Sequence, residues 1–211
     1  MKAILISIRP KWVSKILNGE KTIEIRKSAP KCELPIDVYI YCTKNKLHYN
    51  VGALMFNKDD CFKRSVDGTY KYGDSVELMG YSPDYPYDKN NFLNGKIVAK
   101  FTLKKVEEIK PFSFMELLGD SLTEKQREIA DKSCVGWMGI HKYANGKPVY
   151  LWHISDLEIF DEPKELNEFY SLRLDKDVTK LFDYLIQLSN GKWFKRLDKA
   201  PQSWCYVEEK E

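Results

Sequence analysis

Short strand-like segments follow one another along the chain, and no unit of one strand and one helix repeats. These segments are either continuous runs of apolar, β-branched residues or alternations of apolar and polar residues, and both patterns are typical of strands. They cover residues 3–8, 22–26, 36–42, 96–106 and 149–160. Helix-like segments lie between them at irregular spacing. The order favours an α+β fold, a small mixed β-barrel or curved sheet with peripheral helices, over a doubly wound parallel fold.

The composition excludes several other classes of protein. With 211 residues, of which 43% are hydrophobic and 31% charged, the chain is long enough to bury a core and is neither collagen-like nor largely disordered. It contains no apolar run of about 18 residues, so we expect no membrane association. Its N-terminus lacks the features of a signal peptide.

The five cysteines predict a reduced, cytoplasmic protein. Their number is odd and no two are spaced as a C-x-x-C pair, which argues against a disulfide framework. The three histidines lack the spacing of zinc ligands. Nucleotide-binding glycine motifs and common hydrolase motifs are also absent. We therefore expect no metal and no cofactor.

The most informative segment joins a helix to a strand near the N-terminus. Pro10 stands where the first turn of a helix accepts proline, and Asn18-Gly19 is typical of a helix C-terminus. The strand that follows, Thr-Ile-Glu-Ile-Arg at 22–26, alternates strictly. Ile23 and Ile25 should therefore be buried, and the polar side chains Thr22, Glu24 and Arg26 should share the opposite face.

The rest of the chain suggests one barrel domain with an extension. We expect the barrel at residues 1–170, an irregular Tyr-rich insertion at 57–92, and a C-terminal helix and tail at 171–211 that pack back on the barrel. The helix should span 175–187, and the tail at 200–207 should add an edge strand. Capping boxes at Ser113/Glu116 and Thr123/Gln126 predict two further short helices.

Positive charge is concentrated near the N-terminus. Residues 1–50 contain ten lysine and arginine residues against four acidic residues, whereas the rest of the chain is slightly acidic. Lys11 and Lys15 belong to this basic helix. A surface of this kind attracts phosphate groups, although a solvated lysine-rich helix face gives the same composition.

The helix–strand segment resembles the signature of the ASCH domain family, which belongs to the PUA-like superfamily. The resemblance lies in Leu-Asn-Gly followed by Glu-Lys-Thr-Ile-Glu-Ile-Arg, at residues 17–26. Further segments are similar to the bacterial and phage branch: Ser-Ile-Arg-Pro at 7–10, Trp-His-Ile-Ser-Asp-Leu at 152–157, Pro-Lys-Glu-Leu at 163–166 and Pro-Gln-Ser-Trp at 201–204. Together they cover roughly residues 1–170 and the last ten.

The resemblance implies a five- or six-stranded barrel with a cleft between the first helix and the barrel mouth. Family members are thought to bind RNA, and one branch hydrolyses the acetyl amide of N4-acetylcytidine with a Lys-Thr-Ile-Thr motif. Lys21, Thr22 and Ile23 match that motif, but Glu24 replaces its final threonine. The expected hydroxyl nucleophile is therefore missing.

The same residues form a chemically sensible cluster without the resemblance. Lys21 and Arg26 can hold a phosphate or an oxyanion. Glu24 can accept a hydrogen bond from a base amino group or act as a general base, with Thr22 beside it. We expect Lys21 to be an exposed, flexible cation. Glu24 and Arg26 can equally pair with neighbouring strands as structural residues.

Two further residues are candidates for nucleic-acid contact. They are His153, which lies on a strand, and Tyr143. A histidine can contact a phosphate or assist proton transfer, and a tyrosine can stack on a base. Each is also common as an ordinary structural residue.

Three functions remain open from the sequence. The first is binding of RNA or a modified nucleoside in the cleft near Lys21. The second is a small hydrolase, either a ribonuclease or an amidohydrolase, with Lys21, Glu24 and Thr22 as catalytic residues. The third is a phage or host interaction scaffold that uses the Tyr-rich insertion. The sequence does not indicate the oligomeric state.

Overall fold

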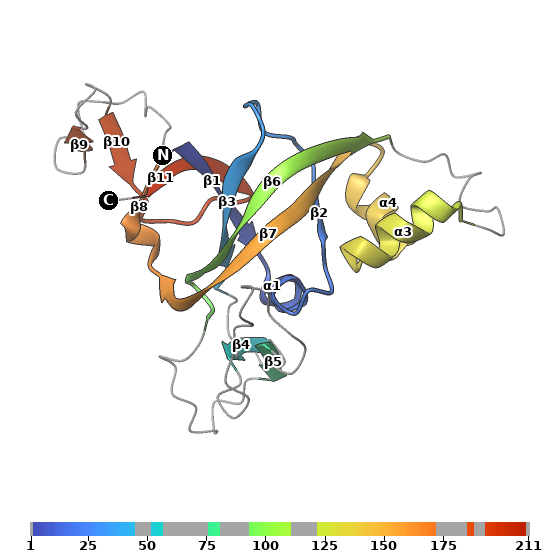
Figure 1. Ribbon diagram of the computed structural model, residues 1–211, viewed down its shortest axis with the longest axis horizontal. Coiled ribbons are helices and arrows are strands. Elements are labelled where there is room, and N and C mark those ends of the chain that lie inside the picture. The colour runs from blue at the N-terminus through green and yellow to red at the C-terminus, as the bar shows by residue number, and fades with distance from the viewer. Residues whose placement is uncertain are drawn as a thin grey trace.

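A computed structural model shows a long curved sheet with helices on its periphery (Figure 1). The structure describes residues 2–44, 93–110, 122–171 and 196–209 in full, and the strands at 52–56, 76–80, 185–187 and 193–195 by their backbone. The expected α+β class is confirmed. The helix expected from Ser113/Glu116 and most of the 57–92 insertion lie outside the described residues.

Nine strands form the main sheet in the order β2-β7-β6-β3-β1-β11-β8-β10-β9. Only the β1–β3 pairing is parallel. The bounds of the strands are β1 Lys2–Ile8, β2 Ile23–Arg26, β3 Ile36–Cys42, β6 Ile97–Ile109, β7 Val149–Lys164, β8 Phe169–Ser171, β9 Leu185–Gln187, β10 Trp193–Arg196 and β11 Trp204–Glu209. A second sheet pairs β4 (Gly52–Phe56) with β5 (Val76–Gly80), beside α1.

The ends of the main sheet, β2 and β9, make no backbone pairing with each other among the described residues. The sheet is therefore curved but not closed, and the barrel expected from the sequence is a loose one. β1 lies inside this sheet, between β3 and β11. Ile4, Ile6 and Ile8 face one apolar cluster while Ala3 and Leu5 face another, so both faces of this strand are buried.

Three α-helices flank the sheet: α1 Pro10–Leu17, α3 Glu124–Ser133 and α4 Trp137–Ala144. α1 has Pro10 in its first turn, and Gly19, at φ +74°, turns the chain after its end. α3 begins at the predicted capping box, in which Thr123 and Gln126 bond reciprocally. Together with the short 3-10 turn Leu166–Glu168, these are the helical elements of the described residues.

The C-terminal segment differs from its prediction in two respects. β9 is a strand at 185–187, where the last turn of a helix was expected, and the rest of that expected helix lies outside the described residues. The tail does form a strand, but β11 lies between β1 and β8 rather than at an edge. It also contains Val207, which is fully buried.

The cysteines provide a test of this packing. Cys42 is fully buried on β3, and burial raises the pKa of its thiol to about 12, whereas Cys32 and Cys134 are partly exposed. Because the thiolate is the reactive form, we expect iodoacetamide at pH 8 to modify Cys32 and Cys134 in the native protein but not Cys42. Mass spectrometry of the peptides measures this, with the urea-unfolded protein as the control. Equal rates at Cys42 and Cys134 in the native protein would contradict the packing.

Candidate functional site

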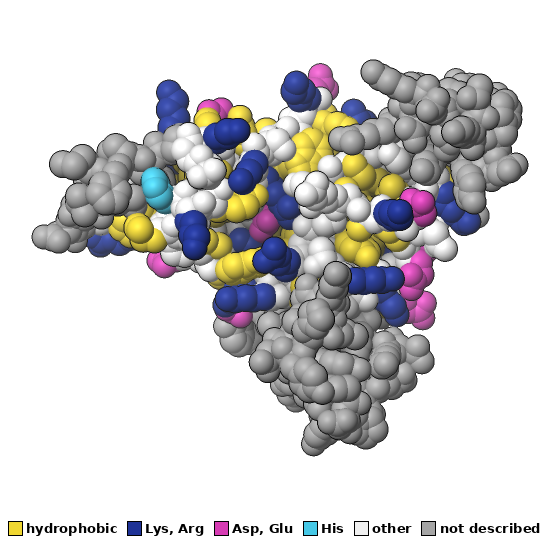
Figure 2. Space-filling view, turned by 180° about the vertical axis from the view of Figure 1, so that it is seen from behind, with side chains coloured by type: hydrophobic (Ala, Val, Ile, Leu, Met, Phe, Trp, Pro, Cys, Tyr) yellow, Lys and Arg dark blue, Asp and Glu magenta, His cyan; other side chains and the backbone are white. Residues whose placement is uncertain are grey.

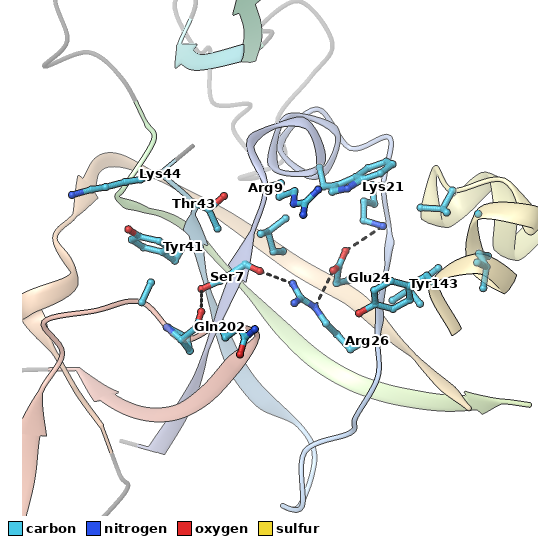
Figure 3. Close-up of a pocket in the computed structure, with 18 residues that line it drawn as sticks. Ser7, Arg9, Lys21, Glu24, Arg26, Tyr41, Thr43, Lys44, Tyr143 and Gln202 are labelled. Atoms are coloured by element: carbon cyan, nitrogen blue, oxygen red, sulfur yellow. Dashed lines mark hydrogen bonds and ion pairs between the residues drawn. The ribbon is translucent and has the colours of Figure 1, made fainter. Parts of the chain in front are cut away.

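A pocket of about 810 Å³ opens where β2 faces the end of β1. Its walls come from α1, β2, α4, the ends of β1 and β3, and the segment that precedes β11. Figure 3 shows the charged residues Lys21, Glu24 and Arg26 gathered on one side of Ser7, and Tyr41, Thr43 and Lys44 on the other. The pocket thus lies along the gap left by the open sheet.

The alternation of β2 directs its side chains as the sequence predicts. Ile23 and Ile25 pack into an apolar cluster with residues of α3 and α4, including Ile129 and Ile140. Glu24 and Arg26 line the pocket. The same strand therefore anchors two helices through one set of side chains and supplies the charged wall of the pocket through the other.

Lys21 is buried, so the expectation of an exposed, flexible lysine is wrong. Its side chain is only 2% exposed. The Nζ atom donates to the carbonyl oxygens of Ile23 at 2.8 Å and Ser133 at 2.7 Å, and lies 3.2 Å from Glu24 Oε2. An ammonium group has three N–H donors, and these three acceptors account for all of them. Desolvation lowers the pKa of Lys21, with Glu24 opposing that effect.

Glu24 lies between two buried cations. Lys21 Nζ contacts Oε2. Arg26 Nε lies 3.0 Å from Oε1, close enough for an ion pair, but this contact is not a hydrogen bond. This arrangement orients the carboxylate and compensates much of the cost of burying it. Each of its oxygens retains a further lone pair for a ligand.

Arg26 also bridges the gap in the sheet. Its guanidinium group donates to the Ser7 carbonyl oxygen at 2.8 Å and to Ser203 Oγ at 3.3 Å. Ser7 in turn donates from Oγ to the Pro201 carbonyl oxygen at 2.6 Å. Side chains therefore connect β2 to β1 and to the segment before β11, where no backbone pairing does so.

Three aromatic residues line the pocket, Trp12, Tyr41 and Tyr143, and the rings of Trp12 and Tyr143 have lysine side chains over them. Trp12 on α1 has Lys11 Nζ at 5.1 Å and Lys21 Nζ at 5.4 Å from its ring centre. Tyr143 on α4 has Lys27 Nζ at 5.0 Å. Rings beside cations are suited to stacking on a base while the cations meet phosphate groups.

The structure places the other candidate residues outside the pocket. Thr22 is exposed before β2, and Lys11 is exposed on α1. Lys15 pairs with Glu20 at 2.7 Å. His153 Nε2 lies 2.7 Å from Glu107 Oε1, in a cluster with Lys105 and away from the pocket. Lys105 is the main cause, and His153 a further one, of the lowering of the pKa of Glu107 to about 2.

Sequence reasoning missed several residues of the pocket. The structure adds Arg9, Trp12, Tyr41, Thr43, Lys44 and Gln202 to its walls. Trp12 fits the apolar face of α1, so its pattern indicates core packing. Arg9 follows β1 directly and Lys44 is the second residue after β3, at positions where side chains often reach a site. Their convergence depends on how distant strands pair.

Positive charge extends from the pocket over the surface around it. On the face seen in Figure 2, Lys and Arg side chains surround the centre, where an acidic side chain is visible among them. The pocket itself is lined by four cationic residues, Arg9, Lys21, Arg26 and Lys44, against the single acidic residue Glu24. This excess of positive charge favours an anionic ligand.

The fold is of the α+β class. The ASCH domain family, which has a PUA-like fold, matches residues 6–163, three quarters of the chain, and the protein belongs to this family. Members of the family are generally RNA-binding. None of the curated proteins compared matches the sequence.

Similar solved structures include the crystal structure of ASCH from Zymomonas mobilis and that of a mutant of the same protein. The first has a TM-score of 0.49 and 12% identity, and covers 98% of this chain and 87% of that one. The second has a TM-score of 0.49 and 11% identity, with coverage of 99% and 91%.

The described part of the chain contains neither a metal-binding cluster nor a membrane-spanning helix. No cluster of three or more His, Cys, Asp or Glu residues there could hold a metal ion. None of the helices that the structure describes is both long and apolar enough to cross a membrane.

Proposed function

We propose that the pocket binds RNA or a modified nucleoside, with the base beside Glu24 and Tyr143. The observation that carries this proposal is the Glu24 carboxylate, fixed between Lys21 and Arg26 on the wall of the pocket. A carboxylate in a fixed orientation accepts a hydrogen bond from an exocyclic amino group, such as N4 of cytosine. The volume of about 810 Å³ also lies within the range of ligand sites.

The bonding of Lys21 favours binding over hydrolysis by a Lys21–Glu24 acid–base pair. A general acid must give a proton to the reacting group, and a general base must have a free lone pair. Lys21 directs its three donors to protein acceptors, and Thr22, the third member of the expected catalytic group, does not line the pocket. Lys21 therefore acts in this proposal as a positioning residue for Glu24.

The test compares two residues of the same helix. Tyr143 is 41% exposed and lines the pocket, whereas Met138 is 62% exposed and does not. Stacking of a base on an aromatic ring contributes about 1–3 kcal/mol, so Tyr143→Ala should weaken binding of nucleosides and short RNA by about tenfold or more. Met138→Ala should leave affinity unchanged.

Calorimetric titration with the four nucleosides and a short RNA measures both variants. Binding by the wild type that falls only in Tyr143→Ala supports the proposal. If the wild type binds none of these ligands, or if both variants bind as the wild type does, the proposed site is wrong.

A further inference from the structure

We propose that the part of the pocket around Tyr41 and Lys44 is a second subsite, which binds a phosphate group attached to the nucleoside. This inference rests on the proposed function, because it places the nucleoside beside Glu24. Figure 3 shows the two groups of residues on either side of Ser7: Glu24, Arg26 and Tyr143 on one side, Tyr41 and Lys44 on the other. A ligand that occupies both parts of the pocket is a nucleotide rather than a nucleoside.

Tyr41 supplies a hydrogen-bond donor at the pocket wall that the fold itself does not use. The residue is 6% exposed, and its ring packs in the apolar cluster that contains Leu5 and Phe160. Yet it lines the pocket, and its hydroxyl group makes no hydrogen bond to another residue within the part of the chain that the structure describes. A hydroxyl group that is open to the pocket and not used by the fold is available to donate to a ligand.

Lys44 supplies the charge. It lines the pocket, and no acidic side chain of the described residues lies within ion-pair distance of it. Gly95 lies beneath its stem: a Cβ atom there would come within 2.4 Å of Lys44 Cε and 2.8 Å of Cγ. The absence of a side chain at Gly95 thus lets the lysine lie along this wall, and Figure 3 shows Lys44 and the Tyr41 hydroxyl directed to the same side.

The charges around this part of the pocket favour an anion. An ammonium group only donates hydrogen bonds, and burial, with smaller effects of Cys42 and Glu165, raises the pKa of Tyr41, which keeps its hydroxyl protonated. Glu165 is the acidic residue whose charge acts on Tyr41, but its carboxylate is exposed and caps the turn at Leu166–Glu168. A phosphate oxygen suits one cation and one neutral donor.

The size of the pocket also leaves room for this second group. Ligand sites usually enclose about 300–1,000 Å³, and the 810 Å³ of this pocket lies toward the upper end of that range. A base beside Glu24 and Tyr143 occupies only the part between β2 and α4. The remaining part, beside β3, is then available to the phosphate.

The test compares each of the four nucleosides with its 3′- and 5′-monophosphates and with dinucleoside monophosphates, by calorimetric titration. The wild type should bind the phosphate-bearing ligand at least about tenfold more tightly, since a hydrogen bond to a charged group is worth about that factor. Tyr41→Phe and Lys44→Met should each reduce this preference severalfold and leave nucleoside affinity unchanged. Preference for the monophosphate indicates a free nucleotide, and preference for the dinucleotide indicates a phosphate of an RNA chain.

Matched controls exist for both variants. Tyr170→Phe removes a hydroxyl from another buried tyrosine, and Lys104→Met removes an exposed lysine paired with Asp156; neither residue lines the pocket. Both should bind as the wild type does. Changes in the controls equal to those in Tyr41→Phe and Lys44→Met would overturn the subsite.

The remaining outcomes separate the subsite from the proposed function. Equal affinity of the wild type for nucleosides and nucleotides overturns the subsite and leaves nucleoside binding intact. If nucleosides do not bind but inorganic phosphate does, and Tyr41→Phe and Lys44→Met weaken it, the subsite stands and the proposed function is wrong. Failure of nucleosides, nucleotides and inorganic phosphate to bind overturns both.

Discussion

A chain that ends at residue 170 is expected to lose cooperative folding. Such a chain lacks β11, which pairs with β1 over five residue pairs, from Lys2–Glu208 to Ile6–Trp204. β1 is buried on both faces, so the loss of β11 from beside it would expose a row of backbone groups of β1 and the apolar side chains next to them. Circular dichroism during heating measures the loss.

The expected size of this effect follows from what β11 covers. Val207 is fully buried in the cluster that contains Leu5 and Phe169. The ring centres of Trp204 and Trp152 lie 5.5 Å apart. Each fully buried large apolar side chain contributes about 1.5–3 kcal/mol. Uncovering several of them costs an amount comparable with the ~5–15 kcal/mol that stabilises a typical domain.

The control is a chain that ends at Glu209, the last residue of β11. It retains the whole strand and should melt as the full chain does. A 1–170 chain that unfolds cooperatively within a few degrees of the full-length protein would show that β11 is dispensable.

The elements near the N-terminus could be predicted from the sequence because their signals are local. Pro10, Asn18-Gly19 and the alternation at 22–26 define α1 and β2, and Thr123 with Gln126 defines the start of α3. In each case the residues that determine the conformation lie within a few positions of one another. Local hydrogen bonds and backbone preferences are sufficient there.

α4 was missed, although the sequence contains a signal for it. Asn145-Gly146 ends this helix as Asn18-Gly19 ends α1, and both Asn145 and Gly146 have positive φ. Trp137, Ile140 and Ala144 are its buried residues, at the spacing of one helix face. The segment is only eight residues long, and so short an apolar pattern is a weak indication of a helix without its caps.

The position of β11 and the composition of the pocket depend on contacts between distant residues. A tail that is apolar and aromatic predicts a strand, but its neighbours are β1, some 200 residues earlier, and β8. The pocket likewise joins Ser7, Arg26 and Ser203 through side-chain bonds. No local pattern specifies such partners, so only four of the pocket residues, Lys21, Glu24, Arg26 and Tyr143, were selected from the sequence.

The burial of Lys21 has the same origin, and it reverses an expectation about stability. A lysine after a helix-ending glycine looks exposed in the sequence. Its partner at the end of α3, the carbonyl oxygen of Ser133, lies 112 residues away and becomes available because Cys134 leaves the helix at φ 54°. A cation at this position also interacts favourably with the C-terminal end of the helix dipole.

Lys21→Ala is therefore expected to destabilise the protein by about 3–5 kcal/mol, the range for removing one partner from a buried ion pair. The change leaves the carbonyl oxygens of Ile23 and Ser133 without their donor and leaves Glu24 with Arg26 as its remaining cation. Urea unfolding at neutral pH measures the loss as a lower midpoint.

Lys15→Ala is the matched control: Lys15 pairs with Glu20 at the surface, and an exposed pair of this kind contributes about 0–1 kcal/mol. If the two variants unfold at the same urea concentration, Lys21 does not hold β2 to α3, and its proposed role in positioning Glu24 fails with it.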